Sequence, residues 1–449
     1  MSDEHEDEGR SGGPRSIDHS VVRTRVGLVI PDIRGVVTPH AVEMRKAEFE
    51  GLAAAINLDT VFSEIVKVRE VRPSTLMGTG QVEALRDRVK AEEIDLLLVD
   101  TALAPAQQRN LEKETGAKVL DRTGLILEIF GERAATREGV LQVELAHLNY
   151  QKSRLVRSWT HLERQRGGFG FLGGPGESQI ESDRRQIEER IKLLEDRLDK
   201  VKRTRSQQRN NREAAQLPIV ALVGYTNAGK SSLFNRLTGA DVRAENLLFA
   251  TLDPTLRKLD LPHGRSAMIS DTVGFVADLP TALVAAFRAT LEEVVEADLI
   301  LHVRDVASPD SAAQAADVLR VLEELGVSGE TTPIIEVWNK VDLLGDRAEA
   351  LQMLRAAGTV AAVVPVSAVT GEGAGELLAS IETALAARSR TYRVRILHQN
   401  GGDVGWLYGH AEIVGRDEPD EEGQTYEVRV DPRHRDSFTQ RFAGRIETA

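Results

Sequence analysis

The feature that most constrains this chain is the segment Gly224–Ser231, whose residues Gly-Tyr-Thr-Asn-Ala-Gly-Lys-Ser fit the pattern GxxxxGK[ST]. An apolar run at 219–223 leads directly into it, so the order predicts a strand, a glycine-rich loop and a helix. Backbone N–H groups in such a loop surround phosphates, and the helix N-terminus adds its dipole. Lys230 would reach the β- and γ-phosphate oxygens, and Ser231 would ligate Mg²⁺. The segment therefore predicts a nucleotide-phosphate site.

Three further motifs follow in chain order, each directly after an apolar stretch. They are Asp271-Thr272-Val273-Gly274, Asn339-Lys340-Val341-Asp342 and the pair Ser367-Ala368. An open α/β sheet places its ligand contacts at the carboxyl ends of its strands. We therefore expect all four segments to meet at one edge of a single sheet.

The later motifs indicate which base is bound. The Asp342 carboxylate can accept hydrogen bonds from guanine N1–H and from the 2-amino group, whereas adenine offers neither donor and would leave the carboxylate unpaired at a cost. Asn339 suits the N7 and O6 side of guanine, and the backbone N–H of Ala368 can donate to O6. The pattern predicts a guanine nucleotide.

Together the four signals resemble the translation-factor class of P-loop GTPases over residues 217 to about 388. This resemblance implies a Ras-like domain with GTP as substrate and Mg²⁺ as cofactor. It also implies that the first switch lies at Phe249-Ala250-Thr251-Leu252-Asp253, with Thr251 ligating Mg²⁺ and sensing the γ-phosphate; Thr255 is the other candidate. The expected GTP contacts are Gly224, Tyr225, Thr226, Asn227, Ala228, Gly229, Lys230, Ser231, Ser232, Phe249, Ala250, Thr251, Leu252, Asp253, Asp271, Thr272, Val273, Gly274, Asn339, Lys340, Val341, Asp342, Ser367, Ala368 and Val369.

Within this set, Lys230, Thr251 and Gly274 are the expected catalytic residues, and Ser231 and Thr251 are the expected metal ligands, with Asp271 holding Mg²⁺ through water. The residue after Gly274 is Phe275. Many GTPases carry there a glutamine that orients the attacking water, and a phenyl ring can neither donate nor accept a hydrogen bond. We therefore expect slow hydrolysis by the protein alone and stimulation by a partner that orders the switches. The sequence assigns no activating group.

Composition limits the remaining possibilities. The chain has 449 residues, enough for three domains, and its 41% apolar and 28% charged residues are typical of a soluble globular protein. It lacks cysteine, which excludes disulfides and thiolate chemistry and fits a reducing cytoplasm. We expect no membrane span, because no apolar run approaches the roughly 18 residues that a span needs. We expect no signal peptide, because the N-terminus is acidic, and residues 1–18 predict a disordered tail.

The chain before the GTPase motifs divides into two parts. Residues 19–135 alternate strand-like and helical segments and predict an α/β domain, with strands at 26–30, 62–71 and 95–100 and helices at 41–56, 81–90 and 104–115. Within it, Gly78-Thr79-Gly80 precedes a helix, and is either an ordinary helix-entry turn or a second nucleotide site.

Residues 136–213 predict a hairpin of two long helices, at 136–164 and 181–212. Ile187, Ile191, Leu194, Leu198 and Val201 form a heptad seam that requires an apolar helix against it, so we expect a monomer with the seam satisfied inside the hairpin. The glycine-rich segment 167–179 predicts a loop at the tip. Its phenylalanines and the flanking arginines either stack on unpaired bases and contact phosphates, or belong to a loop that packs back on the hairpin. The RNA-contact candidates are Arg164, Arg166, Phe169, Phe171, Arg184 and Arg185.

Residues 151–213 contain 16 Lys and Arg against 10 Asp and Glu in a chain whose formal net charge is −13. Such a basic segment is either a surface that binds the phosphate backbone of a nucleic acid or a solvated helical surface. After the GTPase region, alternating strands at 391–397 and 425–430 predict a small α+β domain over 390–449, whose aromatic residues we expect in its core.

The Gly-rich segment from Gly167 to Arg185, between an α/β domain and a GTPase domain, resembles the HflX family of ribosome-associated GTPases. The resemblance spans residues 20 to about 388 and extends less specifically to the C-terminus. It implies binding to the large ribosomal subunit and its RNA, and the splitting or rescue of stalled ribosomes under stress. In one departure, this chain has Phe171-Leu172 and an extra glycine where the family often carries an arginine, so a contact made by that arginine does not carry over.

Two other functions remain open at this stage. One is a GTP-dependent signalling or scaffold switch whose helical seam docks a protein partner. The other is a GTPase that assists RNA modification, which the absence of cysteine disfavours because such GTPases often end in one.

Overall fold

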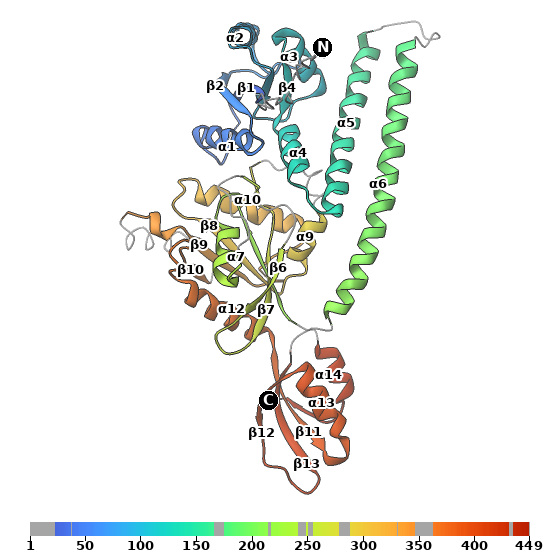
Figure 1. Ribbon diagram of the computed structural model, residues 1–449, viewed down its shortest axis with the longest axis vertical. Helices are drawn as coiled ribbons and strands as arrows, with labels where there is room; N and C mark the ends of the chain where they lie inside the picture. Colours follow the sequence, from blue (N-terminus) through green and yellow to red (C-terminus); the bar gives the residue numbers. More distant parts are fainter. Residues whose placement is uncertain are drawn as a thin grey trace, which may run out of the picture.

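The computed structural model describes residues 23–36, 38–165, 175–213, 217–240, 248–249, 255–277, 288–329, 331–345, 362–430 and 434–448. Figure 1 shows an elongated arrangement, with the N-terminal α/β domain at one end, the GTPase domain in the middle and the C-terminal domain at the other end. The two hairpin helices run beside the first two domains. Among these residues, no helix is both long and apolar enough to cross a membrane. The predicted multidomain α/β fold is confirmed.

The N-terminal domain is a parallel four-stranded sheet in the order β2-β1-β3-β4. Its central strand β1 is buried from Val26 to Pro31, because helices cover both faces of a parallel sheet. The predicted strands and helices of this domain are all present. The elements are β1 (Arg25–Ile33), α1 (Val42–Ala55), β2 (Asp59–Val68), α2 (Thr79–Ala91), β3 (Leu96–Val99), α3 (Pro105–Thr115), β4 (Lys118–Asp121) and α4 (Arg122–Arg133).

The Gly78-Thr79-Gly80 segment forms the entry to α2. The Gln81 side chain accepts a hydrogen bond from the Gly78 N–H at 3.0 Å and donates to the Lys67 carbonyl of β2 at 2.8 Å. The side chain thus caps the helix and ties it to the sheet, which favours the ordinary helix-entry interpretation.

The hairpin consists of α5 (Arg137–Gln165) and α6 (Pro175–Glu213). The second helix begins six residues earlier than the sequence predicted, so 175–179 are helical and not part of the tip loop. Proline is favoured in the first turn of a helix, where its missing N–H costs nothing, and that explains the earlier start. The heptad seam packs inside the hairpin, as expected: Leu141, Leu194 and Leu198 are buried, and the partly buried Leu145, Leu148 and Val201 pack against them.

The GTPase domain has a six-stranded sheet in the order β10-β9-β8-β5-β7-β6, parallel except for β6. The carboxyl ends of β5, β7 and β9 therefore bring the predicted motifs to one edge. The elements are β5 (Ile219–Gly224), α7 (Lys230–Thr238), β6 (Thr255–Asp260), β7 (Ser266–Asp271), α9 (Arg288–Val295), β8 (Leu299–Asp305), α10 (Ser311–Glu324), β9 (Ile334–Asn339), η1 (Val341–Leu343), β10 (Val363–Pro365) and α12 (Ala374–Arg388).

The C-terminal domain is an antiparallel sheet in the order β12-β13-β11-β14. The Trp406 ring packs against the core, with 5.5 Å between its centroid and that of Phe442, as predicted for the aromatics of this domain. Tyr408 is 65% exposed and does not fit that prediction. Both lie on one short helix, and the Tyr408 side chain falls on its solvent-facing side. The elements are β11 (Arg390–Leu397), η2 (His398–Asn400), α13 (Gly401–His410), β12 (Glu412–Arg416), β13 (Gly423–Val430), α14 (Arg435–Arg441) and β14 (Ile446–Thr448).

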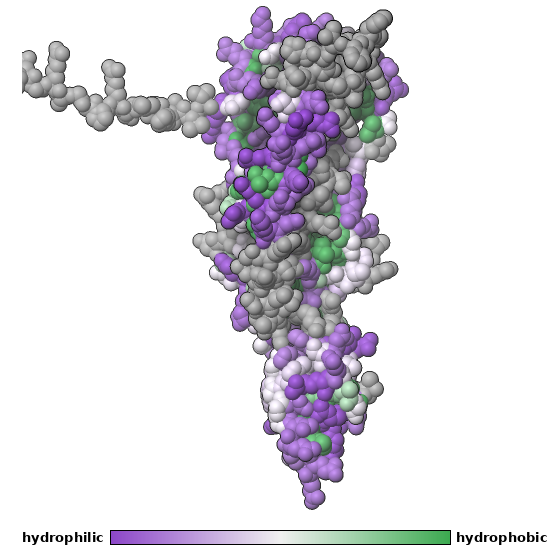
Figure 2. All heavy atoms as spheres, turned by 90° about the vertical axis from the view of Figure 1, so that its right-hand side faces the viewer, coloured by the Kyte–Doolittle hydropathy of each residue, from purple (hydrophilic) through white to green (hydrophobic). Residues whose placement is uncertain are grey.

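One hydrophobic core continues from the N-terminal domain into the GTPase domain. It joins Phe49 and Phe130 of the first domain to Phe249, Phe275 and Leu291 of the second. By contrast, the part of the face in Figure 2 that the structure describes is mostly hydrophilic, with scattered hydrophobic spots. The two domains are therefore packed as one unit around the carboxyl edge of the β5–β7 sheet.

Candidate nucleotide site

The phosphate loop runs from the end of β5 into α7, and the lysine at its end is hydrogen-bonded to carbonyls at its start. Lys230 is 6% exposed, and its ammonium donates to the Gly224 carbonyl at 3.0 Å and to the Tyr225 carbonyl at 2.9 Å. Gly229 has a left-handed φ of 92°, and a Cβ there would lie 2.2 Å from Asn339 Nδ2. The loop therefore requires glycine at this position, because only glycine allows both this conformation and this approach.

A serine and a carboxylate meet at the base of the loop. Ser231 Oγ donates to Asp271 Oδ2 at 2.7 Å, and Asp271 is fully buried at the end of β7. Hydroxyl and carboxylate oxygens are the ligands that Mg²⁺ prefers. The pair fits a magnesium ion at the place where the sequence predicted one.

Gly274 lies against the phosphate loop. A Cβ at this position would stand 2.7 Å from Thr226 Cγ2 and 3.1 Å from Lys230 Nζ. Two residues earlier, the Thr272 hydroxyl donates to the Leu222 carbonyl at 2.5 Å and fixes this segment to β5. The Gly274 backbone is thus next to the lysine that would hold the β- and γ-phosphates.

Asn339 connects the base-recognition segments to the phosphate loop. Its amide Nδ2 donates to the Ala228 carbonyl at 2.8 Å, and its Oδ1 accepts from the Ala368 N–H at 3.0 Å. The Ala368 N–H that we assigned to guanine O6 therefore has a protein partner here. Asp342 is exposed on η1, open to a ligand.

Sequence reasoning missed the partner of Lys340. Lys340 Nζ forms an ion pair with Asp305 Oδ2 at 2.7 Å, and Asp305 is the last residue of β8. The sequence did contain a signal for this contact, because Asp305 is a carboxylate at the end of a buried strand in the middle of the GTPase region.

The first switch is described only in part. Ala250, Thr251, Leu252 and Asp253 lie outside the described residues, and Thr255 begins β6. The Phe249 ring is 2% exposed and packs edge-on against Phe130 of α4, with 4.6 Å between the ring centroids. Its side chain therefore belongs to the interdomain core.

Phe275 lies in the same core, 1% exposed. Its N–H donates to the Gly224 carbonyl at 3.1 Å, and its carbonyl accepts from the Thr226 N–H at 2.7 Å. The backbone thus forms a bridge between the phosphate loop and the second switch, while the ring is packed away. A buried phenyl ring cannot orient a water molecule, in agreement with the sequence argument.

The RNA-contact candidates are described unevenly. Arg166, Phe169, Phe171 and the side chain of Arg164 lie outside the described residues. Arg184 is exposed and pairs with Glu188 at 3.2 Å on the same helix, and Arg185 is exposed beside it. The two arginines are thus consecutive, exposed residues of α6.

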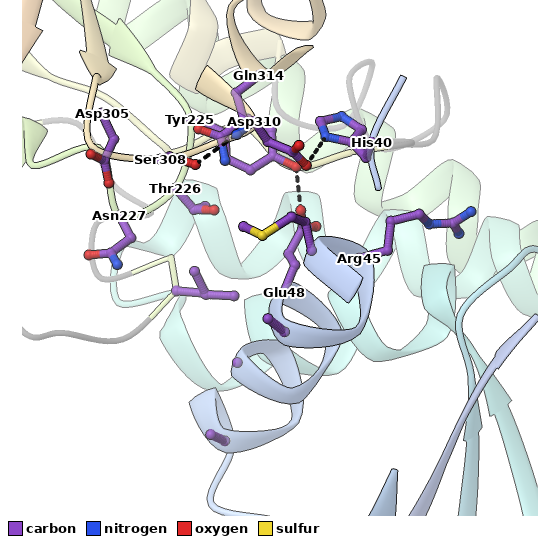
Figure 3. Close-up of a pocket in the computed structure, with 15 residues that line it drawn as sticks. His40, Arg45, Glu48, Tyr225, Thr226, Asn227, Asp305, Ser308, Asp310 and Gln314 are labelled. Atoms are coloured by element: carbon purple, nitrogen blue, oxygen red, sulfur yellow. Dashed lines mark hydrogen bonds and ion pairs between the residues drawn. The ribbon is translucent and has the colours of Figure 1, made fainter. Parts of the chain in front are cut away.

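Figure 3 shows a cavity between α1 of the N-terminal domain and the phosphate loop. Its volume is about 320 Å³, and its lining includes Glu48, Thr226 and Asp305. His40, which also lines the cavity, is hydrogen-bonded to two carboxylates of the GTPase domain, Asp310 at 3.2 Å and Asp317 at 2.7 Å. The hydrogen bond to Asp317, although opposed by burial, raises the pKa of His40 above its usual value.

The pKa of Lys230 leads to a prediction about pH. Burial lowers this pKa to about 8, against the charge of Asp271. A bound phosphate interacts with the charged ammonium and raises the pKa of Lys230 again. The affinity for GDP is therefore highest below about pH 8 and falls as the pH rises through that value. We expect the Kd for GDP, measured by calorimetry, to stay constant near about pH 7 and to rise toward about tenfold per pH unit above about pH 8. Lys230→Arg, which stays charged, should remove this slope; a flat wild-type profile would contradict the assignment.

Because the Asn339–Asp342 segment stands beside a phosphate loop at one edge of a parallel sheet, the fold and the site together define a P-loop GTPase. Four family models match in succession: GTP-binding GTPase N-terminal over 43–131, GTP-binding GTPase Middle Region over 133–212, 50S ribosome-binding GTPase over 219–340 and HflX C-terminal domain over 352–448. The chain belongs to the HflX family of GTPases.

Two relatives agree with this family assignment. GTPase HflX of Magnetococcus marinus is 50% identical over 86% of this chain and 88% of its own length. GTPase HflX of Escherichia coli is 44% identical over 79% of this chain and 82% of its own length. Among solved structures, a GTP-binding protein of the archaeon Sulfolobus solfataricus in complex with GDP covers 80% of this chain and 98% of its own length, at 24% identity and a TM-score of 0.42.

Proposed function

We propose that the protein binds GTP with Mg²⁺ and hydrolyses it slowly until a partner orders the switches. The phosphate loop would hold the β- and γ-phosphates through Lys230, Ser231 would ligate Mg²⁺, and Asp271 would hold the ion through water. Thr251 and the Gly274 N–H would contact the γ-phosphate side, and Asn339 and Asp342 would select guanine. When bound, Mg²⁺ would neutralise charge that develops on the phosphates.

We further propose that the partner is the large ribosomal subunit with its RNA, and that the GTP cycle serves to split or rescue stalled ribosomes. The observation that carries this proposal is the match of the GTPase domain to the 50S ribosome-binding GTPase family, within a chain that matches the HflX family plan throughout. The rival switch, which would dock a partner helix on the heptad seam, is disfavoured because that seam is buried inside the hairpin. We expect the protein to act as a cytoplasmic monomer.

The test is GTP hydrolysis with and without purified large ribosomal subunits. We expect stimulation of at least about a hundredfold, because partner-supplied groups accelerate this chemistry by about 10³–10⁵. Arg184→Ala combined with Arg185→Ala should raise the subunit concentration needed for half-maximal stimulation, and Arg197→Ala, an exposed arginine further along α6, serves as the matched control. Good GTP binding with no stimulation by the subunit would point to a different activator.

A further inference from the structure

Arg236, near the end of α7, reaches across to the turn at 367–371 that follows β10. Its Nε donates to the Ala368 carbonyl at 3.1 Å, and its Nη2 donates to the Val369 carbonyl. The guanidinium also lies against Gly371, where a Cβ would stand 3.6 Å from the guanidinium carbon. One side chain of the helix after the phosphate loop thus holds two consecutive carbonyls of the segment that is expected to contact the base.

The backbone groups of residues 367–369 are all hydrogen-bonded except one. The N–H and the carbonyl of Ser367 both form hydrogen bonds within the turn, and the Ala368 N–H donates to Asn339 Oδ1 at 3.0 Å. The Val369 N–H has no hydrogen-bond partner among the residues that the structure describes, and Val369 is 75% exposed. Because backbone donors are nearly always paired, this N–H is the donor of the turn that is open to a ligand.

Arg236 determines where this donor points. The C=O of Ala368 and the N–H of Val369 belong to one planar trans peptide, in which the two groups point in opposite directions. Since Arg236 holds the Ala368 carbonyl toward α7, the Val369 N–H faces the other way. Guanine O6 is an acceptor, whereas adenine carries a donor amino group at the same position. An N–H held there favours guanine and disfavours adenine.

We propose that Arg236 is a positioning residue for guanine recognition, and that the donor it presents to O6 is the Val369 N–H. This inference rests on the proposed function, because it concerns the same guanine nucleotide. It adds a second point of base recognition to Asp342, which is expected at the N1 and 2-amino side. The Ala368 N–H can then keep its bond to Asn339 when the nucleotide binds.

The chemistry of arginine suits this role. Its planar guanidinium presents several N–H donors in a fixed fork, so two of them can hold two successive carbonyls in one arrangement. Hydrogen bonds from a charged donor are also stronger than those between neutral groups. Arg236 acts through the backbone of the turn and leaves the contact with the base to the Val369 N–H.

The test is Arg236→Ala, measured as the Kd for GDP and for the diphosphate of 2-aminopurine riboside, which lacks O6. We expect GDP affinity to fall about tenfold, the scale of one hydrogen bond, because the donor is no longer held in place. Affinity for the 2-aminopurine nucleotide should stay within about twofold, since it has no O6 contact to lose. Arg236→Lys should restore part of the GDP affinity, because an ammonium can still donate to a carbonyl but lacks the fork.

Arg25→Ala is the matched control. This exposed arginine donates to the Glu92 carbonyl at 3.0 Å in the N-terminal domain, so its removal should leave both affinities unchanged. Inosine diphosphate separates the two points of base recognition, because it keeps O6 and lacks the 2-amino group. Arg236→Ala should therefore lower GDP and inosine diphosphate affinity by the same factor, whereas Asp342→Asn should change their ratio.

Two results would overturn the proposal. Equal loss of GDP and of the 2-aminopurine nucleotide in Arg236→Ala would mean that Arg236 only supports the fold of the domain. Unchanged GDP affinity in the same variant would mean that the turn is held without it. A wild-type protein that fails to bind GDP would be a different result, because it would overturn the proposed function and this inference with it.

Discussion

Asp342→Asn is expected to lower the affinity for GTP by about a hundredfold, because it replaces the acceptor of two guanine hydrogen bonds with an amide that presents a donor. Asp342 is exposed on η1 near Asn339, whose side-chain oxygen already accepts from the Ala368 N–H and so does not replace the lost acceptor. Equilibrium binding of GTP and GDP measures the loss.

The same variant should gain affinity for xanthosine triphosphate, whose 2-oxo group accepts the hydrogen bond that the new amide donates. This gain is the internal control, because a protein that is merely unfolded binds neither nucleotide. Unchanged GTP affinity would remove the specificity argument, and loss of both nucleotides would mean that Asp342 supports the fold of the loop.

Gly274→Ala is expected to lower GTP hydrolysis by about a hundredfold while largely sparing GDP. The added Cβ would stand 2.7 Å from Thr226 Cγ2 and 3.1 Å from Lys230 Nζ. Relief of that overlap must move the second switch away from the phosphate loop, and a displacement of about 1 Å at such a site can cost about 10² in rate. Single-turnover hydrolysis and GDP binding separate the two effects.

Gly80→Ala is the control for Gly274→Ala. Gly80 lies within α2, where a Cβ meets nothing within 4 Å, so alanine should leave hydrolysis unchanged and slightly favour the helix. Wild-type hydrolysis by the Gly274→Ala protein would show that the γ-phosphate contact comes from elsewhere.

Much of the nucleotide site was predictable because each motif is local. The glycine pattern, lysine and serine of 224–231 lie within eight residues, and strand periodicity places them at a carboxyl edge. The same holds for the hairpin seam, whose heptad spacing requires a partner helix that the next stretch of chain supplies. The start of α6 was misjudged because glycines next to a proline predict a loop, whereas this proline opens a helix.

Contacts between residues far apart in the chain could not be predicted from the sequence. Tyr225 and Glu48 are 177 residues apart, and Lys340 and Asp305 are 35 apart, so no local spacing relates them. Phe249 and Phe275 read as switch residues, and their burial in the core shared with Phe130 depends on where the N-terminal domain docks. The sequence by itself determined which ligand the loop is built for, because that chemistry lies in short segments. Only the tertiary structure decided what holds the second switch, because that depends on side chains brought together by domain packing.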